Sequence, residues 1–267
     1  MSGNIIEVTN LHKHYGAVQA VNGISFNIGR GESFAFLGPN GAGKSTTIKM
    51  LVTLLQPSSG DALINNLSLT RHSSAIRRLI GYVPQLISVD GTLTAYENLL
   101  LMAKLYDIPR RERADRASEV LEFLNLSDQK NSLVKTFSGG MIRRLEIGQA
   151  IIHQPQIIYL DEPTSGLDPV ARQNVWEHIM DLRDRMNTTI FFSTHQMEEA
   201  ENYSDRLAII HKGKIEAIGS SEQIRIATNK HNATLDDAFI HFTGSELNQV
   251  GRFRDIRQAR QNERRLG

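Results

Sequence analysis

The stretch Gly38-Pro39-Asn40-Gly41-Ala42-Gly43-Lys44-Ser45 decides the fold of this 267-residue chain. An apolar run at residues 34–37 precedes it, and a helix-like segment beginning at Thr46 follows it. Strand, glycine-rich loop and helix in this order, with the pattern G-x-x-x-x-G-K-S, predict a phosphate-binding loop. The alternative is a glycine-rich turn before an ordinary helix, but every fixed position of the motif is filled.

The chemistry of a phosphate site requires each part of this loop. Glycine lacks a Cβ, so the backbone can wrap closely around an anion. The loop N–H groups and the helix N-terminus direct positive partial charge at that anion. Lys44 would bring a full charge to the β- and γ-phosphates, and the Ser45 hydroxyl is placed to bind Mg²⁺. Alone, the loop predicts that a nucleoside phosphate binds to Gly38, Pro39, Asn40, Gly41, Ala42, Gly43, Lys44, Ser45 and Thr46.

Composition limits the class of protein. Lys and Arg number 30 against 29 Asp and Glu, and this net charge of +1 gives no bulk argument for nucleic-acid binding. The chain has no cysteine, which excludes disulfides and thiolate chemistry. No apolar run reaches the roughly 18 residues of a spanning helix. Because residues 1–4 also lack a secretion-signal pattern, we expect a chain that stays in the cytoplasm and does not itself cross a membrane.

Hydrophobic patterns predict a mixture of strands and helices. The stretch 156–160, which is apolar from Ile157 onward, predicts a parallel strand that is buried on both faces. Asp168 before Pro169 predicts the start of a helix. Further strands are expected at 5–8, 24–28, 61–64, 79–83 and 188–192, with a hairpin formed by 207–210 and 214–218.

The stretch between about residues 88 and 152 has a different character. Helical spacing of apolar residues covers 93–106 and 110–124, and Ser138 is a plausible N-cap for a third helix. No strand pattern interrupts these helices. We therefore expect a helical subdomain inserted into an α/β chain.

Two carboxylates, Asp161 and Glu162, follow the strand expected at 156–160. Ligands of open α/β sheets bind at the carboxyl ends of strands. Asp161 could hold Mg²⁺ opposite Ser45, and Glu162, pointing to the other side, could polarise an attacking water. A solvated strand end is the alternative. His195 follows the next strand and could reach the γ-phosphate or the water, although an isolated histidine is more often a surface residue.

Two more residues have open interpretations. Tyr15 could be a buried tyrosine with one hydrogen bond, or a platform on which a base stacks. Gln85 could be a solvated loop residue, or a neutral ligand that senses a metal-bound nucleotide. The sequence offers no H-x-x-x-H or G-x-S-x-G pattern in support of zinc or serine-hydrolase chemistry.

Read in order, the motifs resemble those of the ATP-binding subunit of an ABC transporter. They are Tyr15, the 38–45 loop, Gln85, Phe137-Ser138-Gly139-Gly140-Met141, residues 157–162, Ser165-Gly166-Leu167-Asp168 and His195. The resemblance implies a P-loop NTPase fold with a RecA-like parallel sheet core, an N-terminal antiparallel β region and the inserted helical subdomain. It implies a nucleotide-binding domain at 1–225 and a short C-terminal extension at 226–267 that ends in an arginine-rich tail.

The resemblance also assigns nucleotide and metal contacts. ATP and Mg²⁺ are the implied cofactors. Tyr15 would stack on adenine, and Gln85 would touch Mg²⁺ together with Ser45 and Asp161. Gln85 would in addition respond to the membrane partner.

Catalytic roles follow from the same resemblance. Glu162 would be the general base and His195 the switch histidine, acting beside Lys44. Two copies of the chain would close head to tail. Ser138, Gly139 and Gly140 of one copy would then cap the γ-phosphate held by Lys44 of the other.

Details of the sequence favour export. The family's commonest signature begins with Leu and ends with Gln, where this chain has Phe137 and Met141. Met141 with the following residues 143–146, and the segment 233–244, are similar to the exporter branch that includes antibiotic-resistance and nodulation-factor ATPases. The resemblance implies a peripheral subunit at the cytoplasmic face of the membrane, which powers export through a separate permease.

Two rivals remain open at this point. One is an ATPase that drives import. The other is a non-transport ABC-type ATPase of translation or DNA repair, which the single nucleotide domain and short helical insert disfavour. We expect no nucleic-acid partner. The tail after Gly251 carries six arginines against Asp255 and Glu263, and is expected to be a solvated end or, alternatively, to be attracted to anionic lipid.

Overall fold

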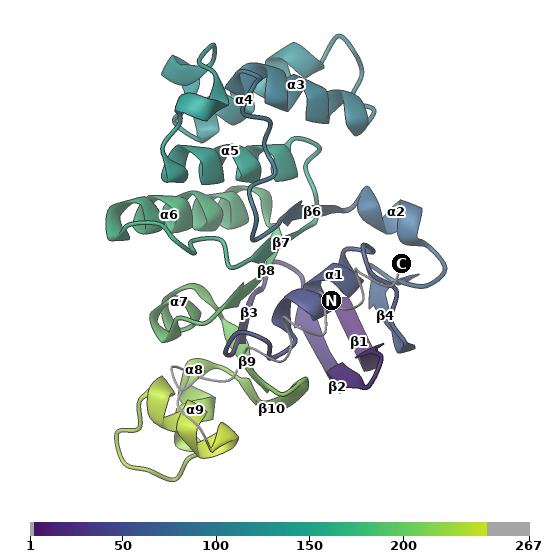
Figure 1. The fold of residues 1–267 in the computed structure, drawn as a ribbon, viewed down its shortest axis with the longest axis vertical. Coiled ribbons are helices and arrows are strands. Elements are labelled where there is room, and N and C mark those ends of the chain that lie inside the picture. The colour runs from purple at the N-terminus through teal and green to yellow at the C-terminus, as the bar shows by residue number, and fades with distance from the viewer. Residues whose placement is uncertain (1–2, 245–267) are drawn as a thin grey trace.

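Two β-sheets form the framework of the computed structural model, which describes residues 3–244. One sheet has the strand order β2-β1-β4-β5, and the other has the order β10-β9-β3-β8-β7-β6. Figure 1 shows the helices α3, α4 and α5 gathered at one end of the molecule, with α8 and α9 at the opposite end. The expected α/β class is confirmed. The arginine-rich tail lies outside the described residues.

The first sheet is antiparallel throughout. It contains β1 (Asn4–Tyr15), β2 (Val18–Gly29), β4 (Ser59–Ile64) and β5 (Leu67–Ser68). The strands expected at 5–8 and 24–28 are therefore the apolar parts of one long hairpin. Register shifts interrupt the alternation of buried side chains along β1, for example between Val8 and Leu11, while the pairing continues to its end. The hydrophobic pattern stops before the hydrogen-bonded strand does.

The second sheet is mostly parallel and carries the motifs. Its strands β3 (Ser33–Leu37), β6 (Ile80–Val83), β7 (Ile157–Asp161) and β8 (Thr189–Thr194) run parallel. The strand β9 (Arg206–His211) is parallel to β3 and forms an antiparallel hairpin with β10 (Lys214–Gly219). Every residue of β3, β7 and β8 is buried, which explains their continuous apolar character. The strand predicted at 156–160 to be buried on both faces, and the hairpin predicted from 207–210 and 214–218, are confirmed.

Helix starts agree with their capping residues. Asp168 caps α6 (Pro169–Met186) by accepting from Val170 N and Ala171 N. Thr94 and Glu97 form a capping box that begins α3 (Ala95–Leu105) two residues later than the apolar pattern predicts. The other helices are α1 (Lys44–Leu51), α2 (Ser73–Arg77), α4 (Arg113–Phe123), α5 (Gly139–Ile151), α7 (Met197–Tyr203), α8 (Ser221–Ile226) and α9 (Leu235–Thr243).

The helices expected between 88 and 152 pack on one another. α3, α4 and α5 are in mutual contact, and two 3₁₀ turns, Ser127–Gln129 and Val134–Thr136, connect α4 to α5. The buried Asn98 accepts from Asp90 N and from Gln149 Nε2, which ties the loop before α3 to α5. The helical layer is therefore held by contacts among its own helices and by the packing of α5 against α6 and β6.

Two hydrophobic clusters cover the two faces of the parallel sheet. Phe26, Phe34, Phe36 and Phe191 pack together in the cluster that fills the space between the sheets. The other cluster joins the opposite face to the helices, from α3 to α9. Within residues 3–244, no helix is both long and apolar enough to span a bilayer.

Candidate nucleotide site

The loop between β3 and α1 has the backbone of an anion cradle. Gly41 and Gly43 have φ angles of 83° and 107°, in the left-handed region that glycine tolerates. A Cβ on Gly43 would lie 2.5 Å from the Ala20 carbonyl oxygen, and one on Gly38 would lie 2.3 Å from that of Ile210. Gly38 and Gly43 are therefore required to be glycine, because another backbone segment approaches each of them too closely for a Cβ. The loop leads into the first turn of α1, whose N–H groups lack intrahelical partners.

Lys44 is a buried cation at the start of α1. Its Nζ donates to the carbonyl oxygens of Gly38 at 2.8 Å and Pro39 at 3.2 Å, and lies 3.1 Å from Glu162 Oε1. Burial lowers the pKa of Lys44, while the nearby Glu162 carboxylate opposes that change. The ammonium group is thus held at the loop by carbonyl dipoles and one carboxylate.

Asp161, at the end of β7, connects the loop to the neighbouring strand. Its Oδ1 accepts from Ser45 Oγ at 2.9 Å and from Ser193 Oγ at 2.7 Å. Ser193 Oγ also accepts from Glu162 N at 3.1 Å. Ser193 was not among the predicted site residues. Ser193 is one of three hydroxyl residues in β8, with Thr189 and Thr194 at the ends of the strand, so its sequence carries no distinct signal.

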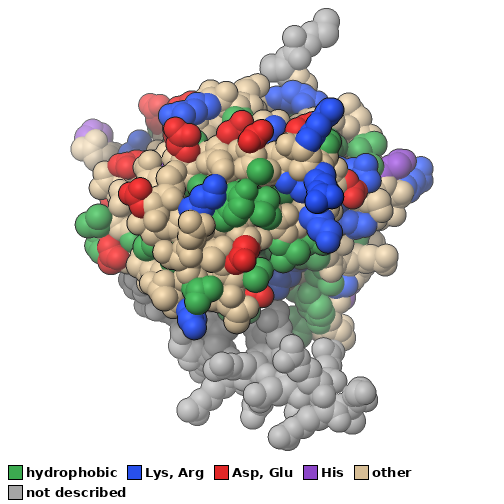
Figure 2. Space-filling model, turned by 90° about the horizontal axis from the view of Figure 1, so that it is seen from above, with side chains coloured by type: hydrophobic (Ala, Val, Ile, Leu, Met, Phe, Trp, Pro, Cys, Tyr) green, Lys and Arg blue, Asp and Glu red, His purple; other side chains and the backbone are tan. Residues whose placement is uncertain are grey.

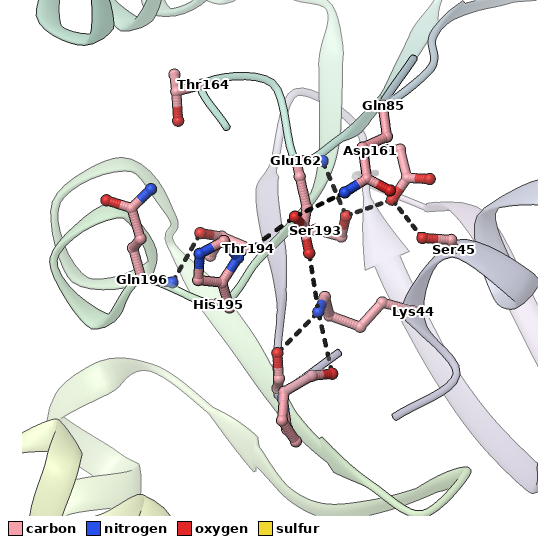
Figure 3. A network of polar contacts seen from close by, with 12 residues as sticks. Lys44, Ser45, Gln85, Asp161, Glu162, Thr164, Ser193, Thr194, His195 and Gln196 are labelled. Atoms are coloured by element: carbon pink, nitrogen blue, oxygen red, sulfur yellow. Dashed lines mark hydrogen bonds and ion pairs between the residues drawn. The ribbon is translucent and has the colours of Figure 1, made fainter. Parts of the chain in front are cut away.

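Glu162 is the residue on which the cluster converges. Its Oε2 accepts from Gln85 Nε2 at 3.1 Å and lies 3.3 Å from His195 Nδ1, as Figure 3 shows. Burial alone would raise the pKa of Glu162, but His195 and Lys44 together lower it below its usual value. Glu162 has a φ angle of 50°, which turns the chain sharply after β7. Asp161 and Glu162 therefore have different side-chain partners, and their separate roles toward metal and water stay predictions.

The donor set fits Mg²⁺ that arrives with a nucleotide. Within residues 3–244, no group of three His, Cys, Asp or Glu side chains could hold a metal on its own. Ser45 and Asp161 place two hard oxygen ligands side by side. Mg²⁺ in such sites takes one or two protein oxygens and completes its shell with phosphates and water.

The segment Ser138-Gly139-Gly140 lies at the start of α5, apart from this cluster. Ser138 is exposed and caps α5 by accepting from Met141 N at 3.3 Å, which confirms the predicted cap. A Cβ on Gly139 would lie 3.3 Å from Leu167, and one on Gly140 would lie 3.0 Å from Ala171. Among the described residues, no hydrogen bond or ion pair joins 138–140 to Lys44. These residues instead pack beside the 165–168 segment and the start of α6.

Tyr15 also lies outside the cluster. It ends β1, at the tip of the β1–β2 hairpin, and pairs with Val18. The side chain is half-buried, and Lys13 Nζ lies 5.4 Å from the ring centroid. Tyr15 is therefore not the fully buried tyrosine of the first interpretation.

A second buried ion pair supports the loop that carries Gln85. Arg143 and Glu146 on α5 lie 3.0 Å apart. Arg143 donates to the carbonyl oxygens of Pro84 and Gln85, and Glu146 accepts from Ser88 N and Oγ. Burial raises the pKa of Glu146, although the Arg143 charge opposes the rise. From the sequence, Arg143 and Glu146 contribute only to the family resemblance, and this supporting role was not predicted.

Comparison with known proteins decides the family of this site. The family model described as "ABC transporter" matches residues 21–165, which include the loop, Gln85, Ser138 and both carboxylates. The chain belongs to the ABC transporter family. The chain is an ATP-binding subunit of this family, and its nucleotide-binding domain is of the ABC ATPase kind.

Three curated relatives in the ABC transporter family carry names that refer to drug resistance or export. The linearmycin resistance ATP-binding protein LnrL of Bacillus subtilis is 39% identical, over 92% of this chain and 77% of the relative. The daunorubicin/doxorubicin resistance ATP-binding protein DrrA of Streptomyces peucetius is 40% identical, over 87% and 71%. The Nod factor export ATP-binding protein I of Ralstonia nicotianae is 37% identical, over 82% and 68%.

Solved structures show the same fold. An ATP-binding subunit of an ABC transporter superposes with a TM-score of 0.79 at 32% identity, covering 89% of this chain and all but 1% of that one. A dimeric ATP-binding cassette, described in a post-hydrolysis state with ADP and Pi, gives a TM-score of 0.73 at 28% identity, over 80% and 98%. The predicted P-loop NTPase fold is thereby confirmed.

Proposed function

We propose that this chain hydrolyses ATP to power export through a separate membrane permease. The observation that carries the proposal is the meeting of Lys44, at the end of the phosphate loop, with Asp161 and Glu162, at the end of β7. The names of the curated relatives, which include drug-resistance and Nod-factor export proteins, support the direction of transport.

The side chains divide the chemistry between them. The loop N–H groups and Lys44 bind and orient the phosphates, and Ser45 with Asp161 holds Mg²⁺, which neutralises phosphate charge when bound. Phosphate oxygens compete with Glu162 for Lys44, because both are anionic partners of one ammonium group. The released Glu162 carboxylate orients a water and accepts its proton. His195 and Gln85, both near Oε2, fix the direction of that carboxylate.

A second copy of the chain would complete the site. Ser138 is exposed at the N-terminus of α5, where N–H groups and a hydroxyl suit an anion, yet it does not join the Lys44 cluster of its own chain. In a head-to-tail dimer, this segment would cap the phosphate bound by the other copy. The dimeric cassette among the structural relatives supports this assembly.

The permease would bind near the Gln85 loop and the helical layer. Exposed apolar side chains are present on both: Leu86 and Ile87 after β6, and Leu101 and Leu105 on α3. Figure 2 views the molecule from the end that carries the helical layer and shows hydrophobic side chains gathered among charged ones. Such a contact would hold the chain as a peripheral subunit at the cytoplasmic membrane face.

The proposal is tested by isolating the chain with its membrane partner. The tagged protein is purified from detergent-solubilised membranes, and ATPase activity is measured for wild type and Glu162→Gln. We expect an integral membrane protein to copurify, and Glu162→Gln to lower kcat by about 100-fold or more while ATP still binds. Glu222→Gln, on the exposed first turn of α8, is the control and should hydrolyse ATP normally. Recovery with ribosomes or DNA alone, or full activity of Glu162→Gln, would contradict the proposal.

The direction of transport is tested in inverted membrane vesicles that contain the complete transporter. Daunorubicin serves as the first probe, because a relative is named for resistance to it. ATP-dependent accumulation inside wild-type vesicles, absent with Glu162→Gln, supports export. ATP-dependent loss of preloaded probe from the vesicles indicates import instead.

A further inference from the structure

Glu199 is a buried carboxylate to which the reaction described above gives no role. It lies in the first turn of α7 and is 3% exposed. Thr164 Oγ1 donates to its Oε1, and Thr194 Oγ1 donates to its Oε2 at 2.6 Å. A buried carboxylate is tolerated only when its oxygens are hydrogen-bonded. Each oxygen of Glu199 therefore depends on a different threonine.

The two threonines belong to two separate parts of the site. Thr164 lies two residues after Glu162 and leads into the 165–168 segment, against which Gly139 packs. Thr194 directly precedes His195, and its Oγ1 also accepts from Gln196 N at 3.0 Å. Figure 3 shows this contact between Thr194 and Gln196 beside the His195 ring. One carboxylate thus bridges the segment after Glu162 and the turn that holds His195.

The bridge depends mainly on these hydroxyl groups. The nearest cation on α6, Arg172, has its Nε 4.0 Å from Glu199 Oε1, at the outer limit of an ion pair. Arg172 is also partly exposed. Hydrogen bonds to a charged acceptor are short and strong, so two of them fix both segments relative to α7.

We propose that Glu199 is a positioning residue that makes His195 and the 164–168 segment move as one unit. The inference rests on the proposed ATPase function. His195 lies 3.3 Å from Glu162, whereas Glu199 contacts neither the phosphate loop nor Lys44. Loss of Glu199 misaligns the groups around the attacking water and leaves the phosphate contacts in place.

The first test compares Glu199→Gln with Glu198→Gln in the full-length protein assembled with its membrane partner. A glutamine has one accepting oxygen, so one threonine loses its acceptor. We expect kcat to fall about tenfold, with the dissociation constant for a non-hydrolysable ATP analogue changed by less than about twofold. Glu198→Gln removes the same charge from the same turn at an exposed position and should leave both quantities unchanged.

The second test uses the threonines. Thr164→Val and Thr194→Val remove one hydroxyl each and keep the side-chain volume. We expect each valine variant to lower kcat. The factor by which Thr194→Val lowers kcat should be about threefold smaller when Glu199→Gln is already present, because residues of one hydrogen-bond network are energetically coupled. If Glu199→Gln fails to fold, the two valine variants decide the question. Wild-type kcat in both overturns the proposal.

Amide hydrogen exchange of the full-length protein separates this inference from the proposed function. Glu199→Gln should raise exchange at 165–167 and at 195–196 together, whereas Glu198→Gln raises neither. Faster exchange in only one segment, or equal loss of ATP affinity and kcat, overturns the coupling. A wild-type chain that hydrolyses no ATP contradicts the ATPase proposal and the catalytic effect assigned to Glu199, and the exchange result still shows whether the bridge exists.

Discussion

Lys44 Nζ lies 3.1 Å from Glu162 Oε1, and the two side chains are only 4% and 6% exposed. This ion pair joins the phosphate loop to the end of β7, two segments more than a hundred residues apart in the chain. Each residue is the other's charge partner in a poorly solvated place. A substitution at either position therefore acts on its partner as well as on the ligand.

Substitution of Lys44 tests the phosphate cradle. We expect Lys44→Ala to weaken ATP binding by about tenfold or more, because a charge-assisted contact to phosphate is lost. The melting temperature should also fall, since Glu162 stays buried without its cation. Titration calorimetry with MgATP and a thermal melt measure the two effects. Lys49→Ala, on the exposed face of the same helix, is the control. Unchanged affinity in Lys44→Ala would remove the lysine from the site.

Ser193 is expected to orient Asp161, the proposed Mg²⁺ ligand. Ser193→Ala removes the hydroxyl that donates to Asp161 Oδ1 and one of the two acceptors of Glu162 N, and leaves the Ser193 carbonyl oxygen as the other acceptor. Groups that orient a metal ligand change metal affinity by about 10- to 100-fold when they are removed. The Mg²⁺ concentration for half-maximal ATPase activity should therefore rise by about tenfold. Ser221→Ala, whose hydroxyl bonds Glu201 away from the site, should show the wild-type Mg²⁺ dependence. The same Mg²⁺ dependence in Ser193→Ala would contradict the assignment.

Mixing two inactive variants tests the head-to-tail assembly. Lys44→Ala damages the phosphate loop and Ser138→Arg damages the opposing cap, so each pure dimer has two defective sites. A mixed dimer has one site in which both parts are intact. Equal mixing should restore about one quarter of wild-type ATPase activity if the two sites act independently. Activity that stays at the level of the separate variants would show that Ser138 and Lys44 do not meet across subunits.

His153 is expected to make the protein less stable in acid. Its ring stacks on Tyr106 at 3.7 Å, its Nε2 pairs with the Ile80 carbonyl oxygen, and burial lowers its pKa from 6.5 to about 4. The unfolded chain takes up a proton as the pH falls through 6.5, but the folded chain does so only near 4. The free energy of unfolding should thus fall between these values, by roughly 3 kcal/mol in total.

The matched variant is His153→Gln, which keeps a donor for the Ile80 carbonyl but cannot titrate. Urea denaturation at several pH values between 7.5 and 4.5 gives the unfolding free energy of both proteins. Plotted against pH, the unfolding free energies of the two proteins should run parallel above pH 7 and separate below it. The free energy of His153→Gln should fall less than that of the wild type. Identical slopes throughout would show that His153 is not the titrating group.

Much of the fold could be predicted because its signals are local. The glycines of the 38–45 loop, the Asp168 cap and the apolar run at 157–160 each act within a few residues of sequence. The length of β1 and β2 could not be predicted, since bulges let the pairing continue where the apolar alternation stops. The short helix α7 was also missed, although it supplies Glu199.

The sequence by itself determined that a phosphate loop, a carboxylate pair and a later histidine occur in one order on an α/β chain. Only the tertiary structure decided that Lys44 pairs with Glu162, that Ser193 supports Asp161, and that Glu199 holds Thr164 and Thr194. Most of these contacts join residues that are distant in sequence and adjacent at the strand ends. A lone serine or glutamate carries no local pattern, so its role depends on which strands the sheet brings side by side.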